Sequence, residues 1–162
     1  MMLALLFIAF IGFWFSLPKD LFKDSHSTVL YDQNGQLLAA HISDDEQWRF
    51  PYNDSIPEKF KLAVLTFEDQ EFYKHPGVNP FALGRATIQN IRNGRIVSGG
   101  STISMQVMRL ARKGKSRSMF EKVKEMFLAL RLEMRYSKDE VLAYWCSYAP
   151  FGGNVVGLEA AS

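Results

Sequence analysis

The N-terminal segment constrains the chain most, because Met1–Leu17 contains no charged side chain and is followed by Pro18-Lys19-Asp20. As a helix it would be about 25 Å long, slightly shorter than a hydrocarbon core of about 30 Å. The alternative is a secretory signal peptide, which has a basic start and small residues at its cleavage site, whereas Phe13–Leu17 is bulky. We expect residues 1–17 to form an uncleaved transmembrane anchor, with Trp14 at the membrane interface.

The whole chain has the composition of a folded protein. Of its 162 residues, 48% are hydrophobic and 22% are charged, which excludes a disordered chain. The formal net charge of +2 does not require a nucleic-acid partner. Cys146 is the single cysteine, which excludes an internal disulfide and a zinc site made of several cysteines.

Local signals predict a linker with a β-hairpin over residues 18–54, followed by helices. Asn34-Gly35 separates two short apolar runs, 28–31 and 36–39, and this dipeptide readily supplies the positive φ of a tight turn. Ser55-Ile56-Pro57-Glu58 predicts a capping box at the start of a helix that stops at His75-Pro76-Gly77. Four more helices are expected, over 80–92, from a Ser101 cap to about 112, over 119–136 and over 138–148. The predicted fold class is mainly α.

Two motif-like segments stand out within the predicted helical region. Glu68, Asp69 and Glu71 lie near a helix C-terminus, where the dipole disfavours anions, and such a local conflict indicates a site. The alternative is a solvated acidic turn. Gly99-Gly100-Ser101 leads into a capped helix, whose N-terminal amides can bind an anion. Taken alone, this second signal is weak.

A basic stretch follows, since ten of the nineteen Lys and Arg residues lie between Arg109 and Lys138. It can hold phosphates, lipid headgroups or nucleic acid, and a solvated helical face is an equal alternative. The helix over 119–136 carries apolar residues on both sides, with Glu125 among leucine and alanine, so we expect the helix to be buried and Glu125 partly desolvated. The structural alternative is a buried Glu125 paired with Lys122 or an arginine.

In this order, the segments resemble glycosyltransferase family 51, which comprises the class A penicillin-binding proteins and the monofunctional transglycosylases. Residues 68–77 match its motif E-D-x-x-F-x-x-H-x-G, and residues 99–106 match G-G-S-T-I-x-x-Q, at every fixed position. Lys122-x-x-Glu125 and Gly157-x-Glu159 resemble its later motifs. Within the family, residues 148–154 are most similar to the 1C type.

The resemblance implies a lysozyme-like helical lobe over residues 55–162, incomplete at its C-terminus. It also implies an inverting enzyme that polymerises lipid II into glycan strands and releases polyprenyl pyrophosphate. Glu68 would be the general base, and Glu125 would assist the leaving group or orient cations. The implied substrate contacts are the pyrophosphate-binding Arg109, Arg117 and Lys122, and the donor-cleft residues Ser101 and Gln106.

The implied surroundings are those of cell wall synthesis. The partners would be lipid II, the nascent glycan strand, the membrane and cell wall synthesis proteins, with no nucleic acid. The catalytic domain would lie on the outer side of the cytoplasmic membrane. No cofactor is firmly implied, although the family allows a divalent ion, Mg²⁺ or Mn²⁺.

The chain departs from the family pattern at Met105, Leu110, Glu121 and Trp145-Cys146-Ser147, where Gln, Asn, Arg and Tyr-Leu-Asn are common. Two other functions stay open. One is a lytic transglycosylase or muramidase, although a basic patch is not needed to cleave a neutral glycan. The other is an inactive, truncated membrane-bound module that binds lipid II.

Overall fold

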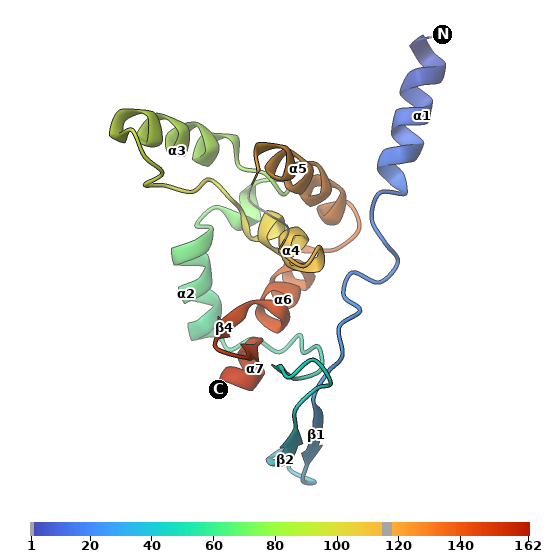
Figure 1. Cartoon of the computed structure of the whole chain (residues 1–162), viewed down its shortest axis with the longest axis vertical. Coiled ribbons are helices and arrows are strands. Elements are labelled where there is room, and N and C mark those ends of the chain that lie inside the picture. The colour runs from blue at the N-terminus through green and yellow to red at the C-terminus, as the bar shows by residue number, and fades with distance from the viewer. Residues whose placement is uncertain (1, 115–117) are drawn as a thin grey trace.

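The computed structural model describes residues 2–114 and 118–162. An N-terminal helix, α1 (Met2–Trp14), stands beside a lobe of helices. An extended segment leads from α1 along the lobe to a hairpin of β1 (Thr28–Tyr31) and β2 (Leu37–His41) at its far end (Figure 1). Helix α1 is shorter than the expected anchor over residues 1–17. Among the described residues, no helix is both long and apolar enough to cross a membrane.

The predicted hairpin is confirmed. Strands β1 and β2 pair antiparallel, and Gly35 takes a φ of 79° in the turn between them. The Asp32 carboxylate accepts the backbone N–H groups of Asn34 and Gln36, each at 2.8 Å, and so stabilises the turn.

Helices make up most of the lobe, so the mainly α fold class is confirmed. Asn79 caps α3 with its side chain, and Gly94 ends that helix in the left-handed region with a φ of 60°. The expected helices over 80–92 and 138–148 are confirmed. The elements of the lobe are α2 (Glu58–Glu68), the 3₁₀ turn η1 (Phe72–Lys74), α3 (Pro80–Asn93), α4 (Ile103–Ala111), α5 (Met119–Glu133), α6 (Lys138–Tyr148) and α7 (Leu158–Ala161).

Two of the predicted helix starts are wrong. The Ser55 capping box does not form, because the Ser55 N–H donates to the Asn53 side chain, and α2 begins only after Pro57. Helix α4 is capped by Thr102 and not by Ser101, since the Thr102 hydroxyl accepts the Met105 N–H at 3.2 Å. Helix α2 also ends at Glu68, well before the expected stop at residues 75–77, because the backbone is extended at Asp69 with a φ of −161°.

A small sheet that the sequence analysis did not predict joins distant parts of the chain. Strand β5 (Val155–Val156) pairs parallel with β3 (Trp48–Arg49) and antiparallel with β4 (Pro150–Gly152). These strands have only two or three residues, which is too short for a period-two pattern to show. The sheet fixes the segment after the hairpin against the end of α6.

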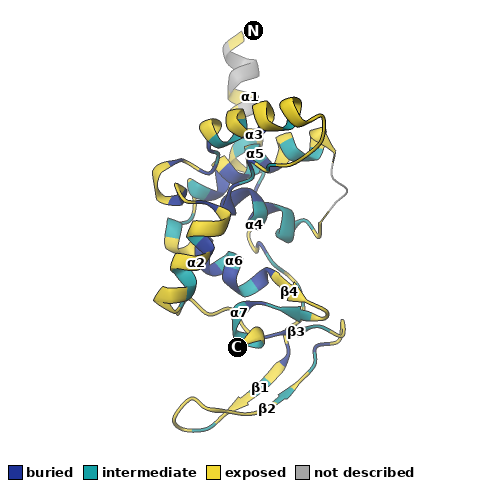
Figure 2. Ribbon diagram, turned by 90° about the vertical axis from the view of Figure 1, so that its left-hand side faces the viewer, coloured by how far each residue is buried: buried dark blue, intermediate teal, exposed yellow. Residues whose placement is uncertain are grey.

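The core lies between α4, α5 and α6, whose inner faces carry most of the buried hydrophobic residues (Figure 2). Its completely buried side chains include Phe72, Ile103, Leu132 and Leu142.

The expected burial of α5 on both sides is wrong. The helix buries Glu125, Ala129 and Leu132, but its other face is apolar and exposed. That exposed face consists of Met119, Phe120, Val123, Phe127, Leu130 and Met134.

Candidate active site

Glu68 is exposed at the last position of α2, where it lines a groove of about 440 Å³. One wall of the groove is the end of α2 and the turn after it. The others are the first turns of α3 and the loop 99–102, which brings Ser101 into the same groove as Glu68. The two motif segments predicted to form the site therefore meet.

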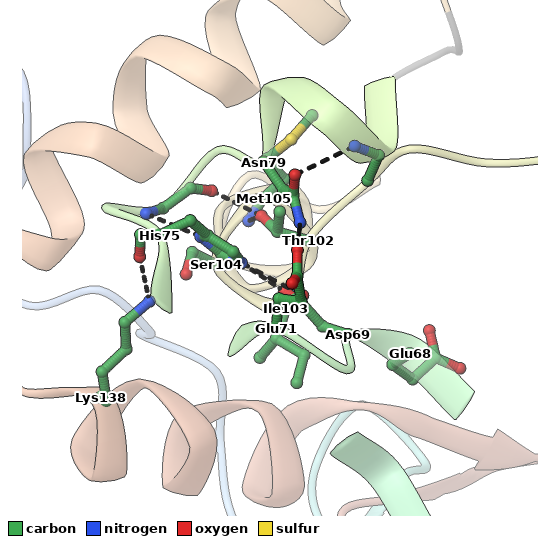
Figure 3. A network of polar contacts seen from close by, with 12 residues as sticks. Glu68, Asp69, Glu71, His75, Asn79, Thr102, Ile103, Ser104, Met105 and Lys138 are labelled. Carbon is green, nitrogen blue, oxygen red and sulfur yellow. Dashed lines mark hydrogen bonds and ion pairs between the residues drawn. The ribbon is translucent and has the colours of Figure 1, made fainter. Parts of the chain in front are cut away.

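The adjacent carboxylate has a different environment, because Asp69 is buried. Its oxygens accept the backbone N–H of Ile103 at 3.2 Å and the Nε2–H of His75 at 3.0 and 3.1 Å. Ile103 is the first residue of α4, so Asp69 binds the positive end of that helix. Figure 3 shows this network, with Glu68 to one side of it.

The hydrogen bonds also define the state of His75. The Gly77 N–H donates to His75 Nδ1 at 3.2 Å, so that nitrogen carries no proton. Nε2 faces the Asp69 carboxylate and donates to it. His75 is buried and positions Asp69 and the turn, and it does not face the groove.

Gly77 and Thr102 hold the first motif, residues 68–77, against α4 and α5. The Thr102 hydroxyl donates to the Gly77 carbonyl at 2.6 Å. Gly77 has a φ of 96°, and a Cβ at this position would lie 2.6 Å from the Ala129 carbonyl oxygen. Both the backbone conformation and the close contact with α5 require glycine.

Gln106 positions Glu68 and does not line the groove. Its Nε2 donates to Glu68 Oε2 at 2.7 Å, and its Oε1 accepts the indole N–H of Trp145 at 2.9 Å. Gln106 was predicted to lie in the donor cleft, and Trp145 was not predicted as a site residue.

Arg109 and Glu125 form a bidentate ion pair between α4 and α5. Arg109 Nε and Nη2 lie 2.8 and 2.7 Å from the two Glu125 oxygens, and Glu125 is 5% exposed. The hydrogen bonds to Glu125 raise the pKa of Arg109. The structural alternative, a buried Glu125 paired with an arginine, is therefore what the structure contains.

Several other members of the basic stretch hold elements together. Arg112 pairs with Glu121, and Lys138 Nζ donates to the His75 carbonyl and to Glu133. Arg131 and Arg135 donate to the backbone carbonyls of Trp14, Pro18 and Lys19, which connects α5 to the end of α1 and the segment after it.

Lys122, another predicted contact, does not line the groove among the described residues. Lys122 is half-buried on α5 and forms no ion pair with a described residue. Arg117 lies outside the described residues.

Arg85, which was not predicted as a site residue, is the basic side chain among the described residues that line the groove. It is exposed on α3, one turn after Phe81, which also lines the groove. Phe81 and Arg85 have i, i+4 spacing on the helix that Asn79 caps, and this spacing was the available signal.

No three His, Cys, Asp or Glu side chains in the described part of the chain are placed to hold a metal ion. The expected divalent ion stays a prediction.

Comparison with known proteins gives consistent results. Residues 34–162 match the family described as Transglycosylase. The chain is 38% identical over 160 residues to penicillin-binding protein 1C of Escherichia coli (strain K12), covering 96% of this chain and 21% of that protein. It is 33% identical over 147 residues to penicillin-binding protein 1A/1B of Bacillus subtilis (strain 168), covering 91% and 16%. It thus spans about a fifth of the length of these relatives.

Proposed function

Because the chain belongs to the transglycosylase family, we propose that it polymerises lipid II into glycan strands and releases polyprenyl pyrophosphate. The observation that carries the proposal is the placement of Glu68. This carboxylate is exposed in a groove and held by a donated hydrogen bond from Gln106. Its neighbour Asp69 ties together the two motifs that form the groove.

Glu68 is the general base in this proposal. It takes the proton from the 4-hydroxyl of the acceptor GlcNAc, and that oxygen bonds to the anomeric carbon of the donor MurNAc. The bond from this carbon to the pyrophosphate oxygen breaks, and the electron pair leaves with polyprenyl pyrophosphate. Attack opposite the leaving group inverts the linkage from α to β. Asp69 is unsuited to this role because its oxygens already accept hydrogen bonds in the interior.

The leaving pyrophosphate needs fixed cations, because negative charge develops on it in the transition state. Arg109 gives two of its five N–H groups to Glu125, and its side chain is 27% exposed, so further donors can face a phosphate. In the proposal Glu125 orients Arg109, while Lys122 and Arg117 add positive charge. Arg85 and Ser101 hold an anionic or polar group of the substrate in the groove beside Glu68.

We place the lobe on the outer surface of the cytoplasmic membrane, with α1 in lipid as part of an anchor over residues 1–17. Support comes from the exposed apolar side chains of α1 and α5, because an exposed apolar patch commonly marks a membrane or protein contact. The rings of Phe13 and Phe127 lie 4.7 Å apart, and the Arg131 guanidinium lies 4.6 Å from the Trp14 ring. Contacts with cell wall synthesis proteins stay a prediction.

Product analysis tests the proposed reaction. The chain is incubated with lipid II in detergent micelles, and the products are separated by length. We expect glycan polymer together with released polyprenyl pyrophosphate. Shortening of preformed glycan strands would indicate a lytic enzyme instead, and binding of lipid II without any product would indicate an inactive module. Either result contradicts the proposal.

A further inference from the structure

We propose that Trp145 is a positioning residue for Glu68 and acts through the side chain of Gln106. This inference rests on the proposed function, in which Glu68 is the general base. Three helices contribute one side chain each, Trp145 from α6, Gln106 from α4 and Glu68 from α2. The two hydrogen bonds that join them measure 2.9 and 2.7 Å.

The chemistry of the two end groups determines the orientation of the amide between them. An indole N–H can only donate, and an ionised carboxylate can only accept. The Gln106 amide must therefore turn its oxygen toward Trp145 and its nitrogen toward Glu68, as the structure has it. Without the indole donor, rotation of the amide by 180° would place its oxygen against the carboxylate, and two acceptors would face each other.

Glu68 depends on this support because little else holds it. Its side chain is exposed at the end of a helix, and Gln106 is its hydrogen-bond donor among the described residues. A long, exposed side chain loses conformational entropy when it is held in one rotamer. Gln106 and Trp145 are only partly exposed, and Trp145 packs against the core, so the support comes from the rigid part of the lobe.

The inference also gives a role to a departure from the family pattern. Trp145 stands where a tyrosine is common, and the sequence analysis attached no function to it. The indole N–H reaches Gln106 from α6, 39 residues further along the chain. Only the packing of α4 against α6 brings the two side chains together.

The kinetic test uses Trp145→Phe, which removes the donor and keeps an aromatic ring, and Gln106→Met, which removes both hydrogen bonds. Trp48→Phe is the matched control, because among the described residues the Trp48 indole has no hydrogen-bond partner. We expect Trp145→Phe to lower kcat about fivefold with KM within about twofold, and Gln106→Met to lower kcat about twentyfold. A hydrogen bond to a carboxylate favours its ionised form. Because both variants weaken or remove this bond to Glu68, the acid limb of their kcat profiles should move to higher pH than in the wild type.

The double variant adds a sharper criterion. If Trp145 acts only through Gln106, the variant with both changes should be no slower than Gln106→Met alone. The inference is wrong if the two effects multiply, or if Trp145→Phe matches Trp48→Phe in kcat and in its pH profile.

A spectroscopic test does not depend on turnover. The three tryptophan indoles give separate N–H signals in a proton–nitrogen NMR spectrum, and loss of one signal in Trp145→Phe assigns it. We expect the Trp145 signal to move as pH passes through the carboxylate range, and to stop moving in Glu68→Gln. A Trp145 signal that is the same in the wild type, Glu68→Gln and Gln106→Met would overturn the inference. Failure of lipid II polymerisation alone would refute the proposed function and leave this result intact.

Discussion

The two adjacent carboxylates at the start of the motif over residues 68–77 have different roles, because Glu68 faces the groove and Asp69 holds the structure around it. The extended backbone at Asp69 sends the Glu68 and Asp69 side chains in different directions, one into the groove and one into the interior. Asp69 is occupied by His75 and by the start of α4, while Glu68 keeps an exposed oxygen near open space. Composition alone could not separate them, because both are acidic residues at the same helix end.

At the same scale, Glu125→Gln tests whether this residue serves Arg109. The amide can accept only one of the two guanidinium bonds, so Arg109 gains uncompensated positive charge. We expect polymerisation to fall at least about tenfold while affinity for polyprenyl pyrophosphate is kept or increased, with about 1–3 kcal/mol lost from the free energy of unfolding. Rates, binding of the lipid pyrophosphate and thermal unfolding are measured on the same preparation. A loss of binding in proportion to the loss of rate would contradict this role.

At the scale of elements, the site depends on a close contact between the first motif and α5. Gly77 touches the backbone of Ala129, and its carbonyl accepts the Thr102 hydroxyl, so the turn, α4 and α5 meet at one point. This contact positions the start of α4, to which Asp69 is bound.

The prediction at this scale concerns two glycines. Gly77→Ala forces a Cβ to 2.6 Å from a carbonyl oxygen at a φ of 96°, so we expect it to lower the free energy of unfolding by at least about 2 kcal/mol. Gly84→Ala is the control, because a Cβ added at this position in the middle of α3 would meet no described atom within 4 Å outside the adjacent helix backbone. It should be neutral or stabilise the helix by up to about 1 kcal/mol. Denaturant unfolding measures the free energy of unfolding of both variants. Equal values for the two would contradict the close contact between Gly77 and α5.

The sequence predicted the elements that have strong local signals. The helix predicted over 80–92 was correct, and it ends at Gly94 because glycine readily adopts the left-handed conformation found there. The Ser55 capping box failed because Asn53 competes for the Ser55 N–H, a local arrangement that the motif does not encode. The strands of the small sheet were too short to show a pattern.

For the site, the motifs located Glu68 and Ser101 but not their supports. The burial of Glu125 was predicted correctly. Its ion-pair partner was not, because Arg109 was only one of several basic residues with which it could have paired. Trp145 and Arg85 were missed because their relation to Glu68 arises from the packing of separate helices.

At the scale of the whole molecule, one titratable group reports on the integrity of the core. Cys146 lies on α6 among the core residues, and burial raises the pKa of its thiol from 9.0 to about 12. The folded state therefore holds this proton more tightly than the unfolded state does. The contribution of the protonated thiol to the free energy of unfolding is fully present below pH 9.0 and is lost as pH rises toward about 12.

We therefore expect the native chain to react with a thiol-alkylating reagent at pH 8 at least about a hundredfold more slowly than the chain in urea. The unfolding midpoint should fall more steeply above pH 9.0 for the wild type than for Cys146→Ala, which lacks the thiol. Equal alkylation rates for the folded and unfolded chains would show that the core around α6 is open.

The most direct test of the central claim compares Glu68→Gln with the wild type in the initial rate of lipid II polymerisation. Lipid II binding is measured on the same samples, and Glu58→Gln, at the other end of α2, is the control variant. The amide at position 68 still fills the groove and can accept from Gln106, so we predict binding within about twofold of the wild type. We also predict a rate about 10²–10⁴-fold lower, the usual contribution of a general base. A Glu68→Gln variant that polymerises as fast as Glu58→Gln, or one that loses binding as much as rate, would contradict the assignment of Glu68 as the base.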